Sequence, residues 1–198
     1  MSFFCLLWVL IIYFLRRGIT GGGASGSVWA LLLGSITAII QFFLGYLFSP
    51  KGFDAATWIF GFMEIVSMPV LIPLVVCFFM LLFRGFSGDA DFANFALLWL
   101  IPIAALKALS WSATNDPILL IIVPLLWVAI AMGISFFINL IVSRCHPLLA
   151  ILSVLCILIL PIAAATSYWA FFSQYTLIGF GLLIFTSIPF ALSFAIRR

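Results

Sequence analysis

Apolar residues follow one another in long runs along this chain, and short polar stretches separate the runs. The runs do not show the two-residue alternation of transmembrane barrel strands. Because backbone amides in lipid must be hydrogen-bonded within their own segment, each run predicts a transmembrane α-helix. The seven runs cover residues 2–15, 27–48, 57–83, 93–110, 118–143, 148–171 and 176–196.

We therefore predict an all-α fold, in which a polytopic transmembrane helical bundle of seven spans forms a single domain over residues 1–198. A full span takes about 20 residues and the first run is shorter, so six spans plus one short N-terminal interfacial helix is the alternative. The connections are short, so helices that follow one another along the chain should be antiparallel neighbours. Residues 18–27 are rich in glycine and serine and predict a flexible linker between the first two helices.

Basic residues are concentrated on one set of alternate connections. Under the positive-inside rule, this asymmetry places the N-terminus outside and the C-terminus in the cytoplasm. Such an arrangement requires an odd number of spans, in agreement with the seven runs. The basic residues of the cytoplasmic set are Arg16, Arg17, Arg84, Arg144, Arg197 and Arg198, whereas the other set contains only Lys51.

The chain is 67% hydrophobic and only 7% charged, a composition that excludes a water-soluble domain of this size. Its net charge of +3 comes from scattered residues, and the lack of a basic run excludes nucleic-acid binding. The four cysteines have no metal-ligand spacing, so neither a metal site nor a cofactor is expected. Compactness and short connections favour the bacterial inner (plasma) membrane as the location.

Glu64 stands about eight residues inside the third run, where an ionised carboxylate without a partner costs several kcal/mol. Lys107 is the natural partner, because both residues lie in the outer half of the predicted bundle within about two helical turns of depth. One interpretation is a substrate- or ion-binding site that opens outward and includes Glu64, Ser67 and Lys107. The alternative is that Lys107 extends to the headgroups while Glu64 hydrogen-bonds a neighbouring helix.

Pro69 and Pro73 follow Glu64 closely, and each removes a backbone donor from the third helix. We expect them to break this helix, which in transporters frees carbonyls and helix ends for ligands. Small residues at four-residue spacing in the second run predict a face on which another helix, from this chain or from a partner, packs closely. This face contains Ala30, Gly34, Ala38 and Gly45.

An enzyme is not expected from these residues. Ser87 lies in a sequence that resembles a nucleophile motif, and His146 is predicted on the same side of the membrane. However, Asp89 stands where that motif requires its second glycine. No catalytic residues are therefore assigned, and an intramembrane enzyme is the third choice of function.

The small amount of chain outside the predicted helices favours a non-enzymatic membrane subunit of a larger complex, such as the transmembrane component of a transport system. Its expected partners are the lipid bilayer and other membrane protein subunits. The alternative is a self-sufficient small carrier or channel that uses the polar site around Glu64. The sequence does not identify a substrate for either function.

Overall fold

The chain folds into helices that match the seven apolar runs. The computed structural model describes residues 3–20, 27–47, 55–76, 79, 89–110, 117–142 and 146–195, and these ranges contain helices and no strands. The prediction of an all-α fold is therefore confirmed for the described part of the chain. The elements are α1 (Phe4–Thr20), α2 (Ser27–Leu47), α3 (Ala55–Phe62), the π-helix η1 (Met63–Leu71), α5 (Asp89–Ser110), α6 (Pro117–Val142), α7 (Pro147–Phe172) and α8 (Thr176–Ala195).

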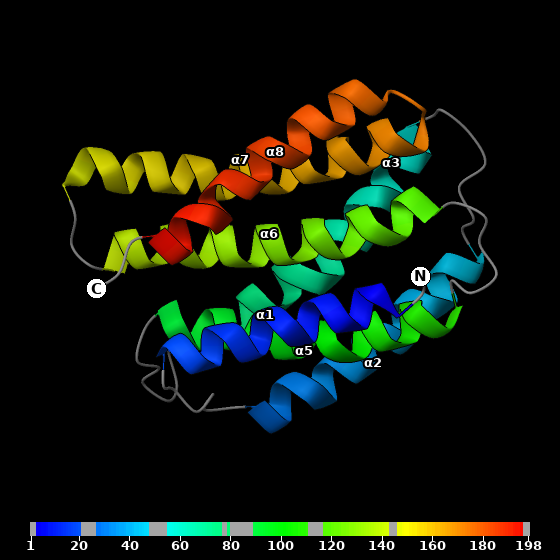
Figure 1. The fold of residues 1–198 in the computed structure, drawn as a ribbon, viewed down its shortest axis with the longest axis horizontal. Coiled ribbons are helices and arrows are strands. Elements are labelled where there is room, and N and C mark those ends of the chain that lie inside the picture. Colours follow the sequence, from blue (N-terminus) through cyan, green and yellow to red (C-terminus); the bar gives the residue numbers. More distant parts are fainter. Residues whose placement is uncertain are drawn as a thin grey trace.

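The helices alternate in direction along the chain, so that α1 begins and α8 ends at opposite ends of the bundle (Figure 1). Figure 1 shows α7 and α8 on one side, α6 in the middle, and α1, α5 and α2 on the other side. The α3 helix continues directly into η1, and together they run obliquely between the two sides. As a result, η1 contacts four other helices, namely α2, α5, α6 and α7.

Most helices that follow one another are packed neighbours in the described part of the chain, and the exception is the pair of α1 and α2. In the second half of the molecule α5 packs on α6, α6 on α7, and α7 on α8. In the first half, α1 packs on α5 and α6, and α2 packs on α5 and η1, so the expected neighbour pair of α1 and α2 is replaced. The reason is the burial of α5, whose residues 92–100 are all buried and therefore need a helix on every side.

The α1 helix packs lengthwise against α5 and α6 rather than across an end of the bundle. Its buried face consists of Cys5, Val9, Ile12, Tyr13 and Arg16, at the spacing of one helix side. The helix also extends through Thr20, into the segment predicted as a linker, while residues 21–26 of that segment lie outside the described residues. The first run thus forms a helix of 17 residues that belongs to the core.

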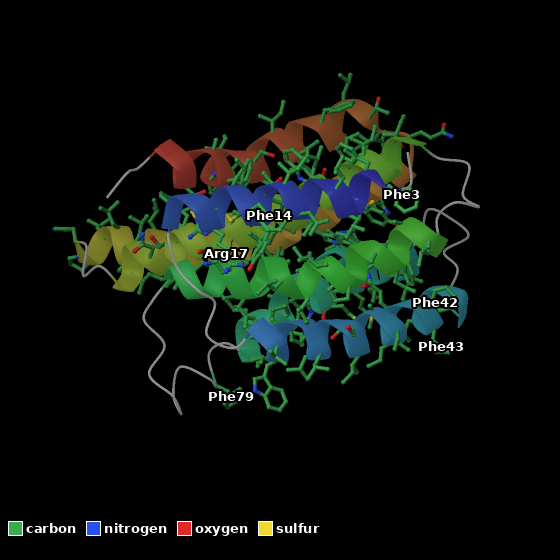
Figure 2. The ribbon with its side chains drawn as sticks, turned by 60° about the horizontal axis from the view of Figure 1, so that its bottom comes forward. Phe3, Phe14, Arg17, Phe42, Phe43 and Phe79 are labelled. Carbon is green, nitrogen blue, oxygen red and sulfur yellow. The ribbon has the colours of Figure 1, made fainter. Side chains whose placement is uncertain are left out.

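The outer surface of the bundle is apolar. Phe42 and Phe43 lie at the surface on α2 (Figure 2), and Leu177 on α8 is 88% exposed. Among the described residues, five helices are long and apolar enough to cross a membrane, and a sixth apolar stretch, Val28–Leu44, is shorter. A multi-pass integral membrane protein is compatible with these helices, because lipid tails accept such side chains where water does not. The five helices are Ala55–Val76, Phe92–Leu109, Ile121–Ile141, Pro147–Phe171 and Thr176–Ser193.

A tight turn joins α7 to α8. The Tyr175 N–H donates to the Ala170 carbonyl at 2.8 Å and the Gln174 N–H donates to the Phe171 carbonyl at 3.2 Å, the paired bonds of a Schellman motif. Gln174 holds the left-handed position of this motif, with a φ of 66°, where glycine is more usual. The turn satisfies the last carbonyls of α7 and returns the chain along α7 as α8.

The α2 and α5 helices are in close contact at Gly34. A Cβ atom built at Gly34 would lie 2.6 Å from the carbonyl oxygen of Trp99, a backbone atom. The predicted small-residue face of α2 lies here, since Ala30, Gly34 and Ala38 are all buried and α2 packs on α5. Because this face is covered by a helix of the same chain, it is not exposed to a partner protein.

We expect Gly34→Ala to lower the free energy of unfolding by about 1–3 kcal/mol, because backbone atoms cannot rotate away from the added methyl group. The matched control is Gly181→Ala in α8, where an added Cβ meets nothing within 4 Å. The control should be neutral or slightly stabilising, because alanine favours helix over glycine. Unfolding of both variants in one detergent measures the difference, and equal effects would contradict the close α2–α5 contact.

Candidate functional site

The third helix is widened, not interrupted, where the prolines occur. Residues Met63–Leu71 form a π-helix that contains Pro69, and helical backbone continues through residues 72–76 across Pro73. At its end the Ile72 N–H donates to the Ser67 carbonyl, five residues earlier, as π-helical winding requires. The expected break at the two prolines is thus replaced by a wider helical turn, a feature often found at functional sites.

The π-helical winding explains an unusual hydrogen bond to the backbone of Glu64. In this winding the carbonyl of Glu64 would accept from the nitrogen of residue 69, but Pro69 has no N–H. Gln41 of α2 fills this position, since its side-chain Nε2 donates to the Glu64 carbonyl at 3.0 Å. A side chain from a neighbouring helix therefore compensates for the donor that the proline removes.

The Glu64 carboxylate is buried and forms an ion pair with Lys107. Glu64 is only 4% exposed, and the Nζ of Lys107 donates to its Oε1 atom. The hydroxyl group of Tyr168 in α7 donates to the other oxygen, Oε2, at a long distance of 3.4 Å. The carboxylate and carbonyl of this one residue therefore join η1 to α5, α7 and α2.

Lys107 directs its charge into the bundle. It lies in the last turn of α5, about one turn before Ser110, yet its side chain is only 13% exposed. From that position a lysine can also extend to the headgroups, as the alternative prediction has it. The structure instead has the ammonium group on Glu64, while the buried Cys5 of α1 lies within electrostatic range of the same lysine.

Gly61 makes room for the tyrosine that reaches Glu64. A Cβ atom at Gly61 would lie 2.7 Å from Cδ1 of Tyr168, so the ring is pressed against the backbone of α3. One helical turn earlier, the indole N–H of Trp58 donates to the hydroxyl of Thr166 at 3.4 Å, a second link between α3 and α7. Trp58 also stacks on Phe62, with ring centroids 5.5 Å apart. Tyr168 therefore joins α7 both to α3 and to the carboxylate of Glu64, whereas Trp58 forms a separate link between α3 and α7.

The other predicted site residues are placed apart from the ion pair. Ser67 is half-buried one turn after Glu64, and among the described residues its hydroxyl has no hydrogen bond to the ion pair. Gly45 lies within α2. His146 caps α7, because its Nδ1 accepts from the Leu148 N–H at 3.3 Å, whereas Ser87 lies outside the described residues.

Two residues of the site were not predicted from the sequence, Gln41 and Tyr168. Gln41 is 6% exposed, and its Oε1 atom is buried without a hydrogen-bond partner among the described residues. The sequence does hold a partial signal for Gln41, since it follows Ala30, Gly34 and Ala38 on the α2 face that packs inward. Its contact with Glu64 depends on the π-helix, which a hydrophobicity pattern does not reveal.

Comparisons of the chain with protein-family models, with curated proteins and with solved structures found no match. The class of the protein is therefore defined by its own fold and site. It is an all-helical protein with helices compatible with membrane insertion, and a buried ion pair lies where four of its helical elements meet.

We expect the two charges of the site to be strongly coupled. Lys107→Met should lower the free energy of unfolding by about 3–5 kcal/mol, because Glu64 would remain buried without its counter-charge. Glu64→Gln should cost less, since Lys107 can then extend toward the headgroups. The double variant should be more stable than Lys107→Met alone, because no buried charge remains.

Unfolding of the purified variants in one detergent measures this coupling, with Arg17→Met as the control. Arg17 is exposed near the end of α1, so its replacement should change the free energy of unfolding by less than about 0.5 kcal/mol. Additive losses in the double variant would show that Glu64 and Lys107 do not depend on each other.

Proposed function

We propose that this protein is a small multi-pass carrier of the bacterial inner membrane, with the Glu64–Lys107 ion pair as its binding site. It has seven spans, with the N-terminus outside and the C-terminus in the cytoplasm. The lengthwise packing of α1 and the alternation of helix directions support seven spans. The arginines Arg16 and Arg17 at the end of α1 support the orientation, because basic residues favour the cytoplasmic side.

The observation that carries this proposal is the burial of one acid and one base at the junction of η1, α2, α5 and α7. Ionisable residues inside a membrane are costly, and those that are kept commonly mark the paths of substrates, ions or protons. One member of a pair of opposite charges can also be replaced by a ligand of the same charge without leaving a net charge in the apolar core.

The position of the pair suggests how the site opens. Lys107 lies one turn from the end of α5, at the same end of the bundle as the start of α3. When Lys107 leaves Glu64, it moves toward this end, which is the outer end in the proposed orientation. The oblique path of α3 and η1 between the two sides of the bundle then lets a tilt of this element alternate access to Glu64.

The decisive experiment measures solute-driven currents and uptake in vesicles that contain the purified protein, with a panel of small cations, anions and zwitterions. Glu64→Gln should reduce uptake of the transported solute about tenfold or more, because the amide cannot hold a cationic partner. Asp89→Asn is the matched control, since it makes the same chemical change in the first turn of α5, away from the pair. Uptake by Glu64→Gln equal to the wild type would remove the proposed site.

A non-enzymatic subunit of a larger membrane complex is the second candidate. It is favoured by the large share of the described residues that lies in helices, and by the broad apolar exposure of α8. The small-residue face of α2 does not contribute to this candidate, because α5 covers it.

Purification in a gentle detergent after crosslinking in the native membrane distinguishes the two candidates. A subunit should copurify with other membrane proteins at a fixed ratio and should show no uptake alone in vesicles. A carrier should purify as the chain alone or with copies of itself and should retain uptake. Recovery of only the isolated chain would exclude the second candidate.

A further inference from the structure

The charge balance of the site limits which ligands it can accept. Glu64 and Lys107 are an acid and a base that are both removed from water, and each compensates the charge of the other. A buried carboxylate that loses its counter-charge is strongly destabilised, so Glu64 must always hold a cation or a proton. A cationic ligand would replace Lys107 on Glu64, whereas an anionic ligand would have to replace Glu64 on Lys107.

The two members of the pair differ in how firmly they are held. Glu64 is 4% exposed on η1, with its carbonyl bound by Gln41 and its Oε2 atom bound by Tyr168. Lys107 is the more exposed partner, and its long flexible side chain starts one turn from the end of its helix. The lysine side chain has more rotatable bonds than the glutamate side chain, and its ammonium group is well hydrated once it reaches water. The ammonium group is therefore the member of the pair that exchanges.

The carboxylate of Glu64 accepts the hydrogen bonds that a primary ammonium group donates. Such a group has three N–H donors and no acceptor. The two carboxylate oxygens of Glu64 provide two acceptors, one of which, Oε1, already accepts from the ammonium group of Lys107. The ring of Tyr168 lies next to this position, since its hydroxyl donates to Oε2 of Glu64, and aromatic rings favour organic cations.

From these observations we infer that the site binds primary ammonium compounds, and that Lys107 is a built-in substitute which occupies the ammonium position when no ligand is present. This inference rests on the proposed carrier function, for which it names the class of substrate. The substrate enters with its charge, displaces the Lys107 ammonium toward the outer end, and leaves the net charge of the membrane interior unchanged.

The first test measures binding to Lys107→Ala, which removes the substitute and leaves space for a small amine. Methylammonium chloride should raise the melting temperature of this variant by several degrees. Tetramethylammonium chloride at equal ionic strength should not, because it has no N–H donor. The double variant Lys107→Ala/Glu64→Gln is the control and should not respond to either salt. An equal response to both salts, or a response of the double variant to methylammonium, would overturn the inference.

The second test uses the wild-type chain, so that it does not depend on whether Lys107→Ala folds. Vesicles with the purified protein should take up labelled methylammonium in a saturable manner at mildly acidic pH, where the probe is almost fully protonated. Empty vesicles and Glu64→Gln vesicles are the controls, and Glu64→Gln should reduce the uptake about tenfold or more. Saturable, Glu64-dependent uptake of another solute by the wild type without uptake of methylammonium would contradict the inference.

The two tests separate this inference from the proposed function. If the vesicles transport another solute in a Glu64-dependent manner but not methylammonium, the carrier function stands and the ammonium class is wrong. If Lys107→Ala binds methylammonium through Glu64 but the wild-type vesicles transport nothing, the ligand chemistry stands and the carrier function is wrong.

Discussion

A buried carboxylate and a buried ammonium group are each costly without a counter-charge, and this constraint determines the arrangement at the centre of the bundle. Glu64 joins η1 to α5 through Lys107 and to α7 through Tyr168. Its backbone carbonyl joins the same element to α2 through Gln41. In lipid the helices gain little from hydrophobic association, because the surroundings are as apolar as their side chains, so polar contacts and close packing determine which helices meet. Here the ion pair provides the polar contact, and the small residues of α2 and α3 provide the close packing.

The π-helix connects the sequence of the third helix to this arrangement. Pro69 removes one backbone donor, and the wider winding moves the unsatisfied carbonyl to Glu64, the residue that also carries the buried charge. Gln41 donates a hydrogen bond to the carbonyl of Glu64, while its own Oε1 has no partner among the described residues. The local departure from α-helical geometry and the ionisable residue are therefore one feature. Their association is what distinguishes this site from a proline kink whose backbone is satisfied within its own helix.

The sequence is sufficient to predict where the helices lie along the chain, but not which helices pack against each other. Long apolar runs predict helices directly, because lipid leaves the backbone no other way to satisfy its amides. The described helices lie on the seven runs, although α1 continues past the first run to Thr20 and the end of the third run lies outside the described residues. The runs do not indicate which helices touch, so the packing of α1 on α5 was not foreseen. Glu64 and Lys107 could be selected as site candidates because a membrane interior contains few charges. Gln41 and Tyr168 could not, because their roles depend on a π-helical register and on the missing side chain of Gly61.

The contact between Gly61 and Tyr168 has a consequence for how this sequence can change over time. The ring occupies the volume that any side chain at position 61 would need, and the same ring carries the hydroxyl that reaches Glu64. A larger residue at position 61 therefore becomes acceptable only together with a smaller one at position 168, which in turn removes the hydroxyl from the carboxylate. Substitutions at positions 61 and 168 are thus expected to occur together. Related sequences that lack this glycine and tyrosine need another hydrogen-bond donor for the buried carboxylate of Glu64.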